Sequence, residues 1–130
     1  MCLIHDFGEA VTGDIPAFNK TEEHEKTEGK AVKNLLSNLP NEICAELSAL
    51  FDEMNARETP EAKLFKSLDN LEALISHNEA DISTWIPLEY EENLVYGQKN
   101  CEWSPWTREL REELRKDSVV KIEENKMEEL

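Results

Sequence analysis

Four side chains that can bind a metal ion or transfer a proton occur within ten residues near the start of the sequence. His5 and Asp6 are adjacent in an apolar segment, Glu9 follows one helical turn later, and Asp14 comes just after the turn at Gly13. An imidazole and a carboxylate in apolar surroundings must be paired, because burying a charge alone is costly. On a helix, His5 and Glu9 project from the same side. The spacing indicates a site for metal binding or acid–base chemistry.

A fifth carboxylate, Asp69, occupies an unusual position in a later helical segment. Its nearest neighbours on the helical wheel are uncharged: Ala62, Phe65, Ala73 and Ser76. A carboxylate on such a stripe favours a metal ion, a cation or several hydrogen-bond donors. The alternative is a salt bridge to a lysine on another helix, and the pattern alone does not decide between them.

These residues belong to two longer motifs that carry a resemblance. The run from His5 to Pro16, His-Asp-Phe-Gly-Glu-Ala-Val-Thr-Gly-Asp-Ile-Pro, resembles the signature of HD-domain phosphohydrolases, most of all the bacterial 5'-deoxynucleotidases and their HD-domain-containing relatives. The run from Glu61 to Glu72 is similar to the second motif of the same group, which includes its last metal-binding aspartate. The order of the two motifs and the interval between them also agree. The resemblance covers the chain as far as about residue 77.

The resemblance implies a role for each of these side chains. His5, Asp6 and Asp69 would bind one divalent metal ion, and their nitrogen and oxygen donors suit manganese, cobalt, iron, nickel or zinc. Such an ion acts as a Lewis acid on a phosphoryl oxygen and lowers the pKa of a bound water. Glu9 would orient or deprotonate the water, and Asp14 would protonate the leaving nucleoside oxygen or hold the water network. The alternatives are a surface partner of lysines for Glu9 and a turn or capping residue for Asp14.

The sequence departs from the family's pattern in one respect. The family uses a further histidine, on a helix before the His-Asp pair, as its first metal ligand, and no histidine precedes His5 here. His24 and His77 do not fit this role, and we expect both to be solvated surface residues. The segment from Met1 also begins apolar and without a capping residue, as the second half of a buried helix does. We therefore expect a truncated gene product, a misassigned start or a fragment.

Apolar residues recur at spacings of three and four along most of the chain, which predicts an all-α fold. Thr59 followed by Pro60 marks one helix start, and Asn41 is expected to cap another. The predicted helices cover residues 1–12, 20–39, 41–54, 60–77, 88–98 and 105–120. We expect an HD-type helical bundle that lacks its first helices, with one domain at residues 1–122 and a frayed tail at residues 123–130.

The charge balance limits the class of partner. The sequence has 29 acidic and 14 basic residues, a net charge of -15, which argues against binding duplex nucleic acid. A small phosphorylated substrate remains compatible, because a bound cation inverts the local field.

The three cysteines (Cys2, Cys44 and Cys101) form no C-x-x-C pair and are expected to be reduced thiols. Without a membrane-length apolar run or a recognisable signal peptide, we expect no membrane partner and a cytoplasmic location.

The resemblance predicts a metal-dependent phosphohydrolase that removes phosphate from nucleoside 5'-monophosphates, with deoxyribonucleotides as the preferred class. Two alternatives stay open. One is another HD hydrolase that acts on nucleoside triphosphates or cyclic nucleotides. The other is an inactive helical scaffold whose exposed apolar face binds a partner, most simply a second copy of itself, as a homo-oligomer or dimer.

Overall fold

The computed structural model describes residues 1–128, while Glu129 and Leu130 lie outside the described residues. Within residues 1–128 the chain is helical without strands, which confirms the all-α prediction. The chain divides into two compact units, Met1–Ala62 and Lys63–Leu130, called here the first and second units. No helix within the described residues is long and apolar enough to cross a membrane.

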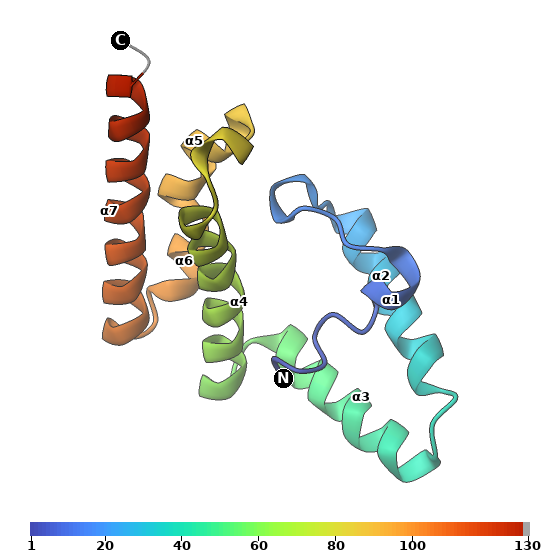
Figure 1. The fold of residues 1–130 in the computed structure, drawn as a ribbon. Coiled ribbons are helices and arrows are strands. Elements are labelled where there is room, and N and C mark those ends of the chain that lie inside the picture. The colour runs from blue at the N-terminus through green and yellow to red at the C-terminus, as the bar shows by residue number, and fades with distance from the viewer. Residues whose placement is uncertain (129–130) are drawn as a thin grey trace. The chain divides into compact units, whose positions relative to one another are not determined.

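The first unit is built on a helical hairpin with a short segment laid against it (Figure 1). Its elements are α1 (Glu9–Thr12), the 3₁₀ turn η1 (Ala17–Asn19), α2 (Glu22–Leu36) and α3 (Asn41–Ala56). The helices α2 and α3 pack together, and α1 lies against α2. The apolar side chains buried in this unit include Ala31, Val32, Leu36, Phe51 and Met54.

The expected helix over residues 1–12 is wrong for its first two turns. Residues 2–8 form successive turns, held by i to i+3 hydrogen bonds such as Ile4 N to Met1 O (3.0 Å) and Phe7 N to Ile4 O (3.1 Å). Helix nucleation is costly, and short helices are stabilised mainly by packing. Leu3 is 95% exposed and supplies no such packing. The predicted stop is confirmed, because Gly13 has φ 78° and its N–H bonds to Glu9 O at 2.8 Å.

Side-chain caps begin two of the helices. At α2, Thr21 Oγ1 accepts from His24 N, and Thr21 N donates to His24 Nδ1 at 3.2 Å. His24 thus lies at the surface, as expected, and also caps this helix. At α4 (Pro60–Glu79), Thr59 Oγ1 accepts from Ala62 N at 3.2 Å, as predicted. Asn41 is the first residue of α3 rather than its cap.

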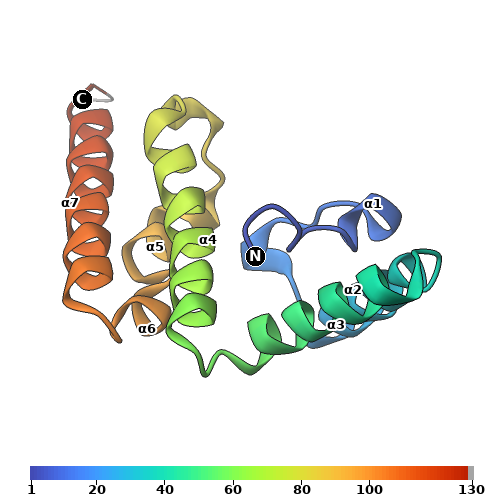
Figure 2. The same ribbon diagram turned by 90° about the horizontal axis from the view of Figure 1, so that it is seen from below.

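The second unit places the long helices α4 and α7 (Pro105–Glu128) on either side of short ones (Figure 2). The short elements are η2 (Ile82–Thr84), α5 (Pro87–Val95) and α6 (Gln98–Cys101). The single helix expected over residues 88–98 is divided at Gly97, which has φ 72°. A Cβ at this glycine would lie 2.8 Å from Asn70 Cβ, so both space and conformation require glycine. The helix α7 continues to Glu128, so the segment expected to fray is helical up to that residue.

Polar side chains fill much of the interior of the second unit. Asn70 donates to Tyr96 Oη (3.0 Å) and accepts from Asn100 Nδ2 (2.7 Å), while Ser67 Oγ donates to Asn100 O (2.7 Å). Arg111 is 4% exposed and donates to the carbonyls that end α5. Buried polar groups are tolerated when they are hydrogen-bonded, and most of these are. This network fixes α4 to the short helices around an apolar cluster of Leu71, Leu74, Cys101 and Leu114.

His77 is also part of this interior, which corrects the prediction of a solvated surface residue. Its Nδ1 lies 2.8 Å from Oδ1 of the fully buried Asn93, and its Nε2 lies 3.5 Å from Glu89 Oε1. Its carbonyl accepts from Trp85 Nε1 at 3.0 Å. The helical periodicity of α4 alone could not reveal these partners, because they come from α5 and the turn before it.

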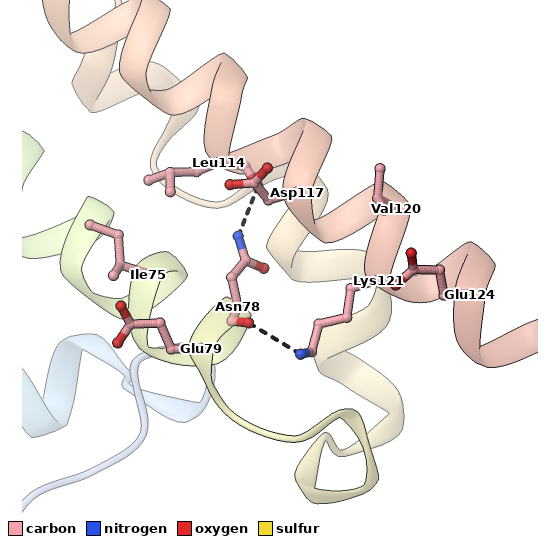
Figure 3. A pocket seen from close by; sticks show the side chains of 8 residues that line it. All are labelled: Ile75, Asn78, Glu79, Leu114, Asp117, Val120, Lys121 and Glu124. Carbon is pink, nitrogen blue, oxygen red and sulfur yellow. Dashed lines mark hydrogen bonds between the residues drawn. The ribbon is translucent and has the colours of Figure 1, made fainter.

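The end of α4 is fastened to α7 beside a hollow of about 400 Å³ (Figure 3). Asn78 Nδ2 donates to Leu114 O at 2.9 Å, Ser118 Oγ donates to Asn78 Oδ1 at 2.7 Å, and Lys121 Nζ donates to Asn78 O at 3.1 Å. The hollow is lined by Ile75, Asn78, Glu79, Leu114, Asp117, Val120, Lys121 and Glu124. These bonds hold the two long helices together.

Candidate active site

The His5 ring contacts a backbone carbonyl through one nitrogen and the Asp6 carboxylate through the other. His5 Nδ1 lies 2.7 Å from Cys2 O, and because a carbonyl can only accept, Nδ1 is the donor. His5 Nε2 lies 3.1 Å from Asp6 Oδ1. Metal-binding histidines commonly use one ring nitrogen to donate to a carbonyl and the other to bind the ion. Two ligands each about 2.1 Å from one ion, at right angles, are about 3 Å apart, so this nitrogen–oxygen separation suits a shared cation.

Carboxylates from two segments meet beside this pair. One oxygen of each of Asp6, Glu9 and Glu28 lies within 4.8 Å of the others. Glu28 comes from α2 and was not among the residues selected from the sequence. It lies in a stretch where charged side chains are so frequent that spacing does not distinguish it. Gly8 is the sequence signal that could have identified Glu28. It lies in the sequence between Asp6 and Glu9, and a glycine there allows another segment to approach closely.

Gly8 allows the site segment to lie directly on α2. A Cβ at this position would collide with the Glu28 side chain and would lie 2.9 Å from Glu28 O and 3.1 Å from Val32 Cγ2. The backbone of Gly8 is in the right-handed helical region, with φ -61°. The requirement is therefore for space and not for an unusual conformation. This close approach brings Glu9 and Glu28 together.

Lys20 supplies a positive charge to the carboxylate cluster. Its Nζ lies 2.6 Å from Glu28 Oε2 and 3.5 Å from Glu9 Oε1. Burial by itself would lower the pKa of Lys20, but its hydrogen bond to Glu28 and the charges of both glutamates outweigh burial and raise the pKa. The lysine therefore stays protonated between the two carboxylates.

Glu9 is held in surroundings that disfavour its charged form. Burial is the largest cause of the raised pKa of Glu9, followed by the negative charges of Asp6 and Asp14. Lys20 lowers this pKa in part, and Glu28 raises it further. Asp14 itself is exposed beyond the Gly13 turn. A carboxylate whose pKa is moved towards neutrality is suited to accept and return a proton.

Asp69 lies on α4 in the second unit, so its convergence with His5 and Asp6 in the first unit stays a prediction. Its Oδ2 is 2.7 Å from Lys66 Nζ, and each side chain is about one quarter exposed. This ion pair joins residues one turn apart on the same helix, so it is not the salt bridge to another helix that was considered, and the metal-binding role of Asp69 stays a prediction. Lys66 was expected to lie elsewhere on the helix, but residues three apart are neighbours on a helix surface, and its long side chain reaches Asp69.

Known proteins similar to this chain agree with the motifs. The sequence model of the HD domain family matches residues 1–111. The 5'-deoxynucleotidase HDDC2 of Danio rerio is 39% identical over 82 residues, which is 61% of this chain and 40% of that protein. The Homo sapiens protein of that name is 37% identical over 82 residues, with the same shares covered, and the Dictyostelium discoideum protein is 32% identical over 81 residues, or 61% and 43%.

The chain spans about two fifths of the length of these curated relatives. No solved structure was found to match it. The resemblance inferred from the two motifs is nevertheless confirmed, since the matched region includes His5, Asp6, Glu9, Asp14 and Asp69. With residues 1–111 of its 130 matched by the family's sequence model, the chain belongs to the HD domain family.

Proposed function

We propose that this protein is a metal-dependent phosphohydrolase that releases inorganic phosphate from nucleoside 5'-monophosphates, with deoxyribonucleotides as the preferred class. Membership of the HD domain family and the similarity to proteins named 5'-deoxynucleotidase support this proposal. The structural observation that supports it best is the His5-Asp6 pair, with Nδ1 directed to a carbonyl and Nε2 3.1 Å from a carboxylate oxygen.

The donor set of the pair fits a divalent transition metal. His5 and Asp6 would hold the ion together with Asp69 of the second unit, and their imidazole and carboxylate groups suit manganese, cobalt, iron, nickel or zinc. When bound, the ion would supply Lewis-acid activation of the phosphoryl group and of water. The carbonyl of Cys2 would orient His5 by accepting from Nδ1.

The protein's own side chains would handle the protons. Glu9 would orient the attacking water and accept its proton. The raised pKa of the Glu9 carboxyl makes it a stronger base than an ordinary glutamate. Asp14 follows the Gly13 turn on an exposed segment, and would donate a proton to the leaving nucleoside oxygen or hold water there. Release of the neutral nucleoside hydroxyl would complete the reaction.

A substrate panel tests this proposal. Purified full-length protein with Mn²⁺ or Co²⁺ is offered deoxyribonucleoside and ribonucleoside monophosphates, nucleoside triphosphates and cyclic nucleotides, and the products are assayed for phosphate, pyrophosphate and ring opening. We expect phosphate from the deoxyribonucleoside monophosphates, with activity lost in Asp6→Asn and retained in the matched surface variant Asp52→Asn. Absence of phosphate release from every deoxynucleotide would refute the proposal.

A second function is favoured by exposed apolar side chains near the candidate site. Leu3 is 95% exposed and Val11 is 63% exposed. Such a surface suits a partner, most simply a second copy of the chain, so we propose a homo-oligomer, with a dimer as the simplest form. An inactive scaffold would form this homo-oligomer without metal, whereas the enzyme would carry near-stoichiometric metal.

The cytoplasmic location stays a prediction.

A further inference from the structure

We propose that Lys20 binds the phosphate group of the substrate, and that Glu28 is a positioning residue that holds Lys20 for this contact. This inference rests on the proposed phosphohydrolase function and assigns residues to which the motifs give no role. It is carried by the position of Lys20 between two carboxylates in the first unit.

The hydrogen-bonding capacity of Lys20 leaves room for a ligand. A lysine ammonium has three donors and no acceptor. In the first unit one donor faces Glu28 Oε2 at 2.6 Å, and Glu9 Oε1 lies at the ion-pair distance of 3.5 Å. The side chain is 27% exposed, so an oxygen from solution can reach the ammonium group. A phosphoryl oxygen is a suitable acceptor for a remaining donor, because charge-assisted hydrogen bonds to phosphate are strong.

Electrostatics also favour a phosphate contact for Lys20. The substrate's phosphate is an anion, and it must approach the carboxylates of Asp6, Glu9 and Glu28, whose oxygens lie within 4.8 Å of one another. Each carboxylate repels it. Lys20 is the cation that the structure pairs with two of these carboxylates. A water bound to Glu9 would lie about 3 Å from its carboxylate. The phosphate that this water attacks would then lie within reach of Lys20 Nζ, because Lys20 contacts the same carboxylate.

Glu28 can fix the lysine because its own position is restricted. Its side chain is 16% exposed and lies under Gly8, where a Cβ would collide with it. Lysine has a long flexible stem that loses conformational entropy when it is held. Without Glu28, Lys20 would retain only the longer contact to Glu9. Glu28 therefore acts through Lys20 and need not touch the substrate.

Two measurements on the full-length protein with Mn²⁺ test the assignment: calorimetric titration with inorganic phosphate, and steady-state kinetics with a deoxynucleoside monophosphate. We expect Lys20→Met to weaken phosphate binding and raise KM by roughly tenfold to a hundredfold, the effect of one charge-assisted hydrogen bond. Lys20→Arg should retain most of the affinity.

Glu28→Gln should raise KM less, by about threefold to tenfold, with kcat less affected. Lys26→Met, at an exposed position of α2, is the matched control and should behave as the unchanged protein.

The outcomes separate this inference from the proposed function. If Lys20→Met keeps the phosphate affinity and KM of the unchanged protein and only its melting temperature falls, the lysine is a structural ion pair and the inference is overturned. If Glu28→Gln leaves KM unchanged, the positioning role is overturned. Phosphate binding that depends on Lys20, in a protein that hydrolyses no nucleotide, would support the lysine's role while refuting the proposed function.

Discussion

The two units use their polar side chains in opposite ways. In the first unit, Asp6, Glu9 and Glu28 gather with their charges close together, and burial and like charges raise the pKa of Glu9. In the second unit, Asn70 and Ser67 are buried and hydrogen-bonded to other parts of that unit. The first unit thus concentrates like charges at one place, which is common at functional sites, whereas the buried polar groups of the second unit are hydrogen-bonded. Changes in the polar interior of the second unit should therefore lower its stability, whereas changes in the carboxylate cluster of the first unit should alter its charge.

The largest expected effect on stability is in the core of the second unit. Leu74 is fully buried, and Leu74→Ala should lower the free energy of unfolding by roughly 3–4 kcal/mol, because it removes apolar contacts and leaves a cavity. Tryptophan fluorescence during urea unfolding measures this, since all three tryptophans lie in the second unit. The matched variant Leu88→Ala, at a side chain that is 39% exposed, should lose less than about 1 kcal/mol. Equal losses would contradict the assigned core.

The polar network should give the next largest effect. Asn70→Ala leaves Tyr96 Oη and Asn100 Nδ2 without the partner they have now, which should cost about 2 kcal/mol of unfolding free energy. The same fluorescence measurement applies, with the exposed Gln98→Ala as control. A variant as stable as the control would show that the network is not needed for the scaffold.

Two glycines in the first unit give opposite predictions. Gly8→Ala forces a Cβ into Glu28 and should destabilise the packing of α1 on α2 by roughly 1–2 kcal/mol. At Gly29, in the middle of α2, an added Cβ meets nothing within 4 Å, so Gly29→Ala should stabilise the helix by up to about 1 kcal/mol. Amide hydrogen exchange of α2 measures both. Similar exchange rates in the two variants would contradict the close approach at Gly8.

The smallest expected effect is a pH dependence at Glu9. Because its pKa is raised in the folded state, the fold binds this proton more tightly than the unfolded chain does. The resulting stability is complete below the unfolded pKa and is lost as the pH rises through the folded pKa. Relative to the unchanged protein, Glu9→Gln should therefore gain stability as the pH rises from the unfolded pKa through the raised folded pKa of Glu9. Urea unfolding in metal-free buffer measures this, and a difference that falls with pH would contradict the assignment.

The sequence predicts most helices correctly because their signals are local. Thr59 with Pro60 begins α4, and Gly13 ends α1, since a cap or a positive φ depends on few neighbours. The turns over residues 2–8 were not predicted, because local periodicity does not show whether Leu3 has anything to pack against. The split at Gly97 follows from its close approach to Asn70, 27 residues earlier, which periodicity also cannot show.

Candidate site residues were predictable where a motif contains them. His5, Asp6 and Glu9 come from one short run, and the structure places Asp6 and Glu9 in one cluster. Glu28 and Lys20 were missed because their roles depend on contacts between segments, made possible by the small size of Gly8. Contacts of this kind depend on tertiary packing and leave little trace in composition or spacing.

Metal titration measures whether His5, Asp6 and Asp69 together bind one divalent ion. Calorimetric titration of the metal-free protein with Mn²⁺ or Co²⁺ should give about one ion per chain. His5→Ala, Asp6→Asn and Asp69→Asn should each weaken binding by at least about tenfold, while the exposed Asp52→Asn leaves it unchanged. If Asp69→Asn binds the ion as tightly as the unchanged protein does, the shared site that the account requires does not exist.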